Sequence, residues 1–174
     1  MVAVQLLQGL AWLHQEYVHC DLKPANILWT TVGQRVAIAD FGCCQRVAEW
    51  LDPRDDCCTP NYRCPELWTK SWSRSSVKLL PTADIWSFGC SLWELHMAGG
   101  LFFPQKERVW VAIEAFVIQH RKGGDRFERW HSRIRLAGAW GPIVEQCLKP
   151  VAAQRPTAQQ ALARVQSTLR QPDP

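Results

Sequence analysis

The chain has 174 residues, of which 47% are hydrophobic and 21% are charged. This balance excludes an intrinsically disordered protein, and the length suits one domain with a buried core. The formal net charge of +4 is too small to indicate a nucleic-acid-binding or membrane-binding protein, and no apolar stretch approaches the length of a membrane span.

The chain contains eight cysteines. Cys43-Cys44 and Cys57-Cys58 are adjacent pairs, which rarely bond each other, and no cysteine spacing is typical of a zinc site. The N-terminus lacks the basic start and apolar run of a secretory leader. We therefore expect free thiols and a reducing location, either cytoplasmic or nuclear.

The first predicted element is a helix over residues 2–18. Leu6, Leu10, Leu13 and Tyr17 recur at three- and four-residue steps, which is the spacing of one helix face. No capping residue precedes this helix, so we expect that the sequence enters the helix after its natural start.

Two short strands are predicted next, over residues 27–30 and 35–39, with a turn at Gly33. Residues 43–65 show no sustained periodicity and contain three prolines, which predicts a long loop. Loops of this length inside a compact domain are usually functional.

Three helices are predicted in the following part of the chain. Residues 82–97 are apolar nearly all round, which predicts a helix buried at the centre of the domain. Residues 107–119 are also predicted to be helical. Residues 125–136 have an amphipathic pattern, with Arg126, Arg129 and Arg133 on a face that we expect to be solvated.

A last helix follows a capping box formed by Thr157 and Gln160, because each of these side chains can bond the other residue's backbone N–H. The tail over residues 171–174 is expected to fray.

The most informative motif is His19-Cys20-Asp21-Leu22-Lys23-Pro24-Ala25-Asn26, with Asp40-Phe41-Gly42 further on. It places a carboxylate, a cation, an amide and a second carboxylate on two loops joined by the predicted hairpin. Phosphoryl transfer needs such groups, one to orient the attacking hydroxyl and others to hold metal and offset phosphate charge. Either motif alone is more often an ordinary loop or turn, but their joint order and spacing are a strong signal.

Three later segments add to this signal, and together the motifs resemble the C-terminal lobe of the eukaryotic protein kinase superfamily. Residues 59–66 resemble the end of an activation loop, residues 84–89 resemble the start of the central helix, and Arg155-Pro156-Thr157 resembles a late structural motif. Lys23-Pro24 is the form seen in serine/threonine kinases.

A narrower similarity links the chain to the cyclin-dependent and MAP kinase branch. It rests on Tyr62-Arg63, Cys90 and residues 101–104.

The resemblance implies an α+β, mostly α fold. In that fold a helical bundle surrounds a buried central helix, and a small β-hairpin carries the catalytic and metal loops. It also implies a partial kinase domain over residues 1–170, with the N-terminal lobe absent.

The resemblance also implies roles for single residues. Asp21 would be the catalytic carboxylate that accepts the proton of the substrate hydroxyl, and Lys23 would be catalytic and contact the transferred phosphate of ATP. Asn26 and Asp40 would hold ATP-bound Mg²⁺, which prefers oxygen ligands. Thr59, in the activation loop, would bond Asp21 and Lys23.

Other family positions imply structural roles. Asp84 would brace the catalytic loop, and Glu66 would form an ion pair with Arg155. Cys20 stands where most kinases carry an arginine that pairs with an activation-loop phosphate. Because cysteine cannot form such a pair, we expect that phosphorylation of this loop is not the main switch.

Two interpretations of function stay open. In the first, the chain is a partial serine/threonine kinase domain that transfers the γ-phosphate of ATP to Ser and Thr hydroxyls of protein substrates. In the second, it is a non-catalytic C-lobe that acts as an interaction or competitor module, which the absence of a Gly-rich loop and strand lysine favours.

Both interpretations predict an exposed apolar surface that an N-terminal lobe or a partner protein would cover. The acidic residues Asp125 and Glu128, interspersed among the arginines of residues 121–135, argue against nucleic acid as a partner.

Overall fold

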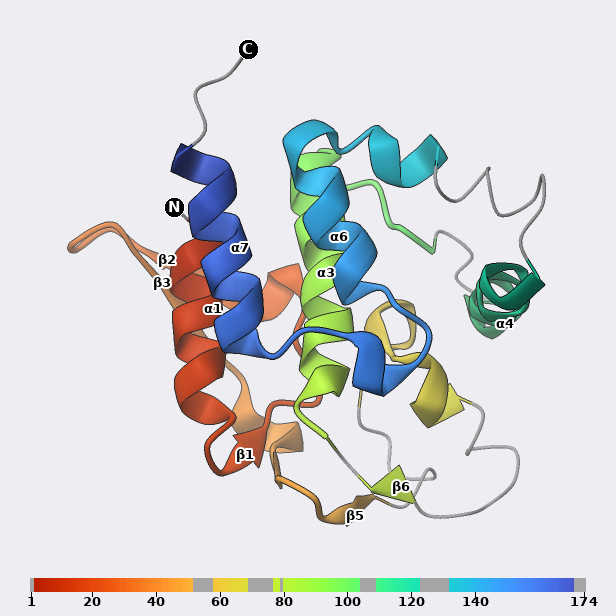
Figure 1. Ribbon diagram of the computed structural model, residues 1–174. Helices are drawn as coiled ribbons and strands as arrows, with labels where there is room; N and C mark the ends of the chain where they lie inside the picture. The colour runs from red at the N-terminus through yellow and green to blue at the C-terminus, as the bar shows by residue number, and fades with distance from the viewer. Residues whose placement is uncertain are drawn as a thin grey trace.

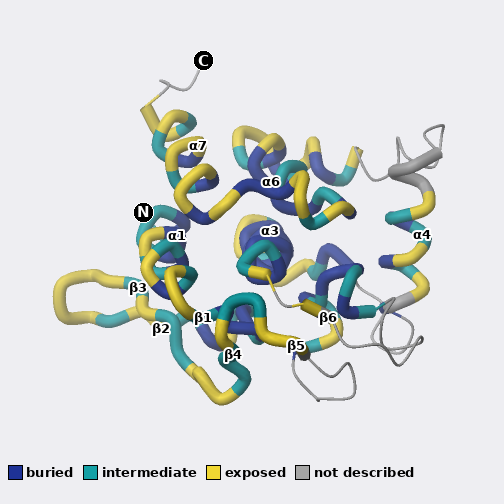
Figure 2. Tube along the Cα trace, turned by 60° about the horizontal axis from the view of Figure 1, so that its bottom comes forward, coloured by how far each residue is buried: buried dark blue, intermediate teal, exposed yellow. Residues whose placement is uncertain are grey.

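The computed structural model describes residues 2–51, 58–68, 77–78, 80–103, 109–122 and 132–170. Helix α3 (Thr82–His96) runs through the centre of the described structure (Figure 1). All residues from Ala83 to Trp93 are buried, and Figure 2 shows α3 nearly end-on with other segments around it. The predicted buried central helix is confirmed, since a helix that is apolar on all sides needs cover on all sides.

Helix α6 (Gly141–Cys147) lies along α3 at a distance that only glycine permits. A Cβ atom placed on Gly89 would lie 2.7 Å from the Cβ of Cys147 and 3.1 Å from Cδ2 of Leu148. Carbon atoms in protein cores pack at about 3.5–4.0 Å. The missing side chain at Gly89 therefore sets the separation of the two helices.

Helices α1 (Val2–Leu13) and α7 (Ala158–Arg170) pack side by side on one flank of α3 (Figures 1 and 2). The predicted capping box before α7 is confirmed. The backbone N–H of Thr157 donates to Gln160 Oε1 at 2.9 Å, and the N–H of Gln160 donates to Thr157 Oγ1 at 3.2 Å.

Helix α1 is shorter than the predicted helix over residues 2–18. The chain turns after Leu13, and β1 (Tyr17–Val18) pairs antiparallel with β4 (Gln45–Arg46). The spacing of Tyr17 matches a helix stripe, but its strand partner lies far along the chain. Local periodicity cannot show such a partner, and the pairing overrides the helical pattern.

The predicted hairpin is confirmed, with strand β2 (Ile27–Thr30) as expected and β3 (Arg35–Ile38) one residue shorter. Ile27 lies opposite Ile38, and the turn places Gly33 at φ 75°. The hairpin rests on α1, where Gln5 Oε1 accepts the backbone N–H of Val36 at 2.6 Å.

The predicted loop over residues 43–65 contains more local structure than expected. It includes β4, strand β5 (Trp50–Leu51), which pairs with β6 (Val77–Lys78), and the 3₁₀ turn η3 (Pro60–Tyr62). Residues 52–57 of this loop lie outside the described residues. The remaining 3₁₀ turns are η1 (Pro24–Asn26), η2 (Phe41–Cys43), η4 (Gly138–Trp140) and η5 (Ala152–Gln154).

The helix predicted over residues 107–119 is observed as α4 (Val109–Lys122). Most of the amphipathic helix predicted over residues 125–136 lies outside the described residues, although residues 132–135 are helical. The prediction of a solvated arginine face is wrong at Arg133. Its Nη2 donates to the carbonyl of Leu101 at 3.0 Å, and its guanidinium lies 5.5 Å from the ring centroid of Trp93. Burial lowers the pKa of this arginine.

The predicted α+β, mostly α class is confirmed. Helices surround α3, and the described strands form three antiparallel pairs. Among the helices in the described part of the chain, none combines the length and apolar content that a bilayer crossing requires. The tail over residues 171–174 lies outside the described residues.

Candidate active site

Asp21 is the centre of a hydrogen-bonded cluster. Its Oδ1 accepts the backbone N–H of Thr59 at 2.8 Å and the Thr59 hydroxyl at 2.7 Å. Its Oδ2 accepts Lys23 Nζ at 2.7 Å. Lys23 Nζ also donates to the Thr59 hydroxyl at 2.7 Å. The structure therefore brings together Asp21, Lys23 and Thr59, as the sequence predicts.

These bonds determine the charge state of Asp21. Partial burial alone would raise its pKa, but the hydrogen bonds from Lys23 and Thr59, with the Lys23 charge, outweigh it and hold the pKa below the ordinary value of 3.8. Asp21 is therefore a carboxylate at neutral pH. It is a good acceptor of a hydrogen bond and a weak base.

Asn26 is buried beside Asp21. Its Nδ2 donates to the backbone carbonyl of Asp21 at 2.9 Å and makes a longer contact of 3.4 Å with Asp21 Oδ2. Its Oδ1 bonds no residue in the described part of the chain. A side-chain oxygen is therefore left available to a ligand.

Asp40 lies apart from this cluster. It is exposed, its backbone is left-handed at φ 62°, and its Oδ1 accepts the N–H of Gly42 at 3.4 Å. No described hydrogen bond joins its carboxylate to Asp21, Lys23 or Asn26. The sequence correctly predicts that the two loops are neighbours, but the structure does not bond Asp40 into the cluster.

Backbone contacts connect the two loops through Ala39, the residue before Asp40. The N–H of Ala39 donates to the carbonyl of Asn26 at 2.9 Å, and His19 Nε2 donates to the carbonyl of Ala39 at 3.0 Å. The His19 ring also meets Phe41 edge-on, with centroids 5.4 Å apart. Because a carbonyl can only accept, His19 carries a proton on Nε2, which leaves Nδ1 to accept the Asp21 N–H at 3.3 Å.

Asp84, near the start of α3, braces the catalytic loop as predicted. Its side chain is fully buried and accepts the backbone N–H of His19 at 2.7 Å and that of Cys20 at 2.9 Å. His14 Nε2, just past the end of α1, lies 2.9 Å from Asp84 Oδ2. The role of His14 was not predicted, and its only sequence signal is a polar residue directly after the apolar stripe of α1.

Cys20 occupies the left-handed region at φ 68°, and its side chain is 2% exposed. It is packed into the core, with Sγ 3.5 Å from the carbonyl of Val18. The side chain at this position therefore faces the interior and offers no cation to a phosphate.

The predicted ion pair between Glu66 and Arg155 is confirmed. The two guanidinium nitrogens Nη1 and Nη2 donate to Glu66 Oε1 and Oε2, both at 2.7 Å. Arg155 is 4% exposed, donates further to the carbonyls of Thr82 and Lys149, and lies over the Trp86 ring. This pair fixes the end of the 58–66 segment to the base of α3.

The same segment has further contacts to α3 that were not predicted. The Ser87 hydroxyl donates to the carbonyl of Tyr62 at 2.8 Å, and the Tyr62 hydroxyl donates to Glu94. Burial and the bond to Glu94 raise the pKa of Tyr62. Asn61 Nδ2 donates to the carbonyl of Phe103 at 2.7 Å. The segment is therefore held along most of its length.

Five cysteines of the described residues are free thiols: Cys43, Cys44, Cys64, Cys90 and Cys147. Burial, aided by nearby negative charge, raises the pKa of Cys44 to about 11, and burial raises that of Cys147 to about 12. Such thiols are protonated at neutral pH and react slowly.

The available oxygen ligands fit Mg²⁺ bound to phosphates. Asn26 and Asp40 supply hard oxygen atoms, and the described residues contain no group of three or more His, Cys, Asp and Glu side chains that could hold a metal ion. Mg²⁺ in phosphate-binding sites commonly takes one or two protein oxygens and completes its shell with phosphate and water.

Comparison with known proteins agrees with this geometry. The family model of the protein kinase domain matches residues 1–165 of the chain. The serine/threonine-protein kinase mos of Gallus gallus is 33% identical over 162 residues, which cover 90% of this chain and 43% of that protein.

Two further relatives are similarly distant. The serine/threonine-protein kinase D1044.8 of Caenorhabditis elegans is 34% identical over 161 residues, which cover 89% of this chain and 14% of that protein. The MAP kinase kinase kinase wis4 of Schizosaccharomyces pombe is 31% identical over 169 residues, covering 89% and 11%.

The chain thus spans less than half the length of these relatives. None of these names places its protein in the cyclin-dependent and MAP kinase branch, so the narrower similarity to that branch stays a prediction. The absence of an N-terminal lobe also stays a prediction. The match over residues 1–165, with these relatives, shows that the chain belongs to the eukaryotic serine/threonine protein kinase superfamily.

Proposed function

We propose that this chain is part of a serine/threonine protein kinase that transfers the γ-phosphate of ATP to Ser and Thr hydroxyls of protein substrates. The observation that carries the proposal is the bonded cluster of Asp21, Lys23 and Thr59, in which one ionised carboxylate and one cation are held side by side. A non-catalytic descendant has no need to keep such a cluster.

Asp21 would orient the attacking hydroxyl. A carboxylate has about four acceptor positions, and three of those on Asp21 hold bonds of 2.7–2.8 Å. The fourth holds only the 3.4 Å contact with Asn26. We infer that the substrate hydroxyl takes this fourth position. Because the pKa of Asp21 is low, its main contribution is to position the hydroxyl rather than to remove its proton early.

The other residues of the site would bind the transferred phosphate and the Mg²⁺ ions. Lys23 would contact the transferred phosphate while its Nζ stays bonded to Asp21. Asn26 and Asp40 would hold Mg²⁺, and the bound ATP–Mg²⁺ would supply the phosphoryl group and offset its negative charge. Asn26 Nδ2 already bonds the Asp21 carbonyl, which leaves Oδ1 for the metal.

We also propose that an N-terminal lobe or a partner protein covers the exposed apolar side chains beside the site. Leu28 on β2 and Phe41 beside Asp40 are 50% and 52% exposed. Exposed apolar side chains that lie beside a site commonly mark an interface. The free cysteines support a reducing location, either cytoplasmic or nuclear.

The test is phosphate transfer from radiolabelled ATP to casein and histone, with the longest natural form of the protein and with the 174-residue chain. Asp21→Asn keeps the shape of the side chain and should lower the transfer rate at least about a hundredfold. Glu16→Gln, an exposed change near the end of α1, is the matched control and should leave the rate unchanged.

Thermal melts of both variants separate loss of chemistry from loss of folding. Normal ATP binding with no transfer by the longest form would overturn the proposal. That result would favour the non-catalytic interaction module.

A further inference from the structure

A two-stranded ribbon joins the loop that follows Asp40 to the base of the central helix. In this β5–β6 ribbon, Trp50 lies opposite Lys78 and Leu51 lies opposite Val77, in antiparallel pairing. Figure 1 shows both strands below the start of α3. The ribbon therefore connects a loop of the candidate site with the helix that supports the site.

Strand β6 lies shortly before the first turn of α3. The backbone N–H of Asp84 donates to the carbonyl of Pro81 at 3.1 Å, so the chain enters α3 through a hydrogen-bonded turn. Residues 83–86 are each at most 5% exposed. This side of the ribbon is therefore attached to a well-packed part of the molecule.

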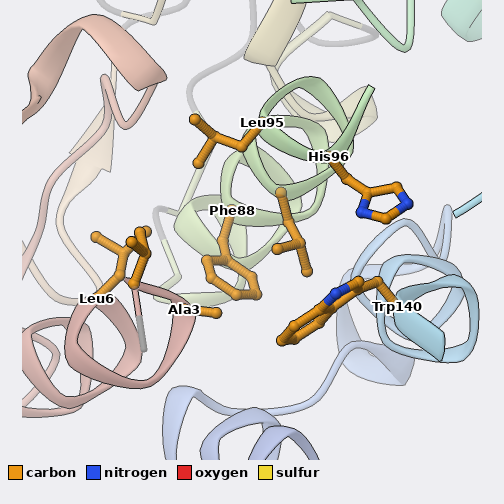
Figure 3. Close-up of a pocket in the computed structure, with 8 residues that line it drawn as sticks. Ala3, Leu6, Phe88, Leu95, His96 and Trp140 are labelled. Atoms are coloured by element: carbon orange, nitrogen blue, oxygen red, sulfur yellow. The ribbon is translucent and has the colours of Figure 1, made fainter. Parts of the chain in front are cut away.

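The opposite end of α3 is packed less completely. A cavity of about 380 Å³ lies between the start of α1, the end of α3 and η4 (Figure 3). Phe88, Leu92, Leu95 and His96 contribute to its lining, whereas none of residues 82–87 does. The ribbon is thus attached at the end of α3 away from this cavity.

Strand β5 follows another pairing of the same loop. Strand β4 pairs with β1, and the N–H of Val47 donates to the carbonyl of Glu16 at 2.8 Å. Between β4 and β5, the backbone of Ala48 is left-handed at φ 65°. A left-handed alanine is strained, and such strain persists only where the surrounding contacts hold it. The pairings on both sides of Ala48 supply these contacts.

The loop ends at Thr59, which is held in the Asp21 cluster. Thr59 shares three hydrogen bonds of 2.7–2.8 Å with Asp21 and Lys23. The side chain of Cys20 is 2% exposed and packed into the core, so it offers no cation to a phosphate on this loop. Order at Thr59 therefore needs contacts other than a phosphate bound at Cys20.

The ribbon supplies such a contact. When β5 is paired, the chain is fixed at Leu51, which is closer to Thr59 in the sequence than β4 is. A chain that is fixed close by gains less conformational entropy when Thr59 leaves Asp21. Pairing of the ribbon therefore favours the position in which Thr59 is bonded to Asp21.

We propose that pairing of the β5–β6 ribbon controls the site: the paired ribbon keeps Thr59 bonded to Asp21 and Lys23, and the parted ribbon releases Thr59 and slows phosphoryl transfer. This inference rests on the proposed function. A ribbon of two residue pairs is marginally stable, and Trp50 is 70% exposed. The ribbon can therefore part while the core stays folded, which makes the control reversible.

The first experiment parts the ribbon in the 174-residue chain. Successive pairs of an antiparallel ribbon are alternately hydrogen-bonded, so Val77→Pro together with Lys78→Pro removes the donor at either position. NMR should show hydrogen exchange at the Thr59 amide at least about fivefold faster. The amide of His19, which Asp84 accepts, should keep its rate.

The control for this experiment is Val77→Thr with Lys78→Arg, which keeps the strand propensity and the charge. It should exchange as the wild type does, and thermal melts check that both variants fold. Unchanged exchange of Thr59 in the proline variant would overturn the proposal. Loss of Thr59 protection in the wild-type chain after phosphatase treatment would also overturn it.

The second experiment closes the ribbon with a disulfide. Trp50→Cys and Lys78→Cys place two thiols on directly opposite residues, whose Cα atoms in antiparallel pairs are about 4.5–5.5 Å apart and within disulfide reach. Peptide mapping by mass spectrometry verifies the bridge. The bridged chain should exchange the Thr59 amide no faster than the wild type. Faster exchange would overturn the proposal.

The third experiment measures phosphate transfer to casein by the longest natural form. The proline variant should lower kcat/KM for casein about fivefold to twentyfold and leave the Kd of ATP unchanged. The bridged variant should transfer phosphate at least as fast as its reduced form. Loss of transfer on bridging would overturn the proposal, because the paired ribbon would then be inhibitory.

The exchange and transfer results separate the two proposals. Unchanged Thr59 exchange with normal wild-type transfer would overturn control by the ribbon and leave the proposed function intact. Faster Thr59 exchange in the proline variant, with no transfer even by the wild type, would overturn the proposed function. In that case the ribbon would still hold Thr59, but it would control no phosphoryl transfer.

Discussion

The two loops of the candidate active site are held in different ways. The loop of residues 19–26 is held by the fully buried Asp84 and by Thr59, through bonds of 2.7–2.9 Å. The loop of Asp40 is exposed, and backbone contacts of Ala39 connect it to the rest. The Asp21 carboxylate is therefore held in a fixed position by several groups, whereas the Asp40 carboxylate is held only by the N–H of Gly42 among the described hydrogen bonds.

Asp84→Ala should destabilise the loop of residues 19–26, which is the better held of the two loops. It leaves the buried N–H groups of His19 and Cys20 without an acceptor and removes the partner of His14, so the free energy of unfolding should fall by about 3–5 kcal/mol. Asp40→Ala, the matched change in the exposed loop, should cost less than about 1 kcal/mol. Urea denaturation monitored by circular dichroism compares the two, and equal losses would contradict the contrast.

Arg155→Met should remove a second support, the ion pair with Glu66 that holds the segment of residues 58–66. It removes the Arg155 cation from Glu66 and one donor from each of three backbone carbonyls, which should cost about 3 kcal/mol. A double-mutant cycle with Glu66→Gln measures the coupling of the pair. A coupling near zero would show that Arg155 acts through the backbone carbonyls and the Trp86 ring and not through Glu66.

Thr59→Val tests the preorganisation of Asp21 itself. Loss of the hydroxyl removes one bond to Asp21 and one acceptor of Lys23, which should cost about 1–2 kcal/mol and raise the pKa of Asp21 toward 3.8.

The sign of the pH effect follows from the lowered pKa. In the wild-type chain Asp21 adds stability that is fully present above 3.8 and is lost as pH falls through its lower native pKa. In Thr59→Val this contribution should be smaller, and its loss should be complete at a higher pH, because the native pKa lies closer to 3.8. Carbon NMR of the Asp21 carboxyl follows both chains, and Thr59→Ser should behave as the wild type. Identical titration curves for all three would show that the hydroxyl has no influence on Asp21.

Gly33→Ala should have an effect confined to the hairpin. The turn of the hairpin requires φ 75°, and a left-handed alanine costs about 1–2 kcal/mol locally. Hydrogen exchange should show faster opening of β2 and β3, while the amide of Thr59 keeps its protection. Loss of protection at Thr59 would mean that the two regions are coupled more tightly than their contacts indicate.

Local pattern predicted most of the fold. The unbroken apolar run of α3, the Thr157 and Gln160 pair before α7, and Gly33 between two strands each carry a signal within a few residues. The end of α1 could not be found in this way, because the strand pair of Tyr17–Val18 with Gln45–Arg46 depends on a distant segment. Arg133 was placed wrongly because its aromatic partner Trp93 lies on another helix.

The candidate site was predictable to a similar extent. The motif gave Asp21, Lys23 and Asn26, the resemblance of residues 59–66 gave Thr59, and the structure places these residues in contact. It could not give His14 or Ser87, because their importance comes from Asp84 and Tyr62, which are far away in the sequence. It also gave no sign that Asp40 would stand apart from the others.

Gly89 has a consequence for how the molecule can move. With no side chain there, α3 and α6 lie so close that a turn of α3 about its own axis would bring a neighbouring side chain into Cys147 and Leu148. We therefore expect α3 and α6 to move together as one rigid unit. Asp84 and Ser87 both belong to α3 and bond the loops of the candidate site. We therefore expect any movement of the site to occur in these loops, while α3 stays in place.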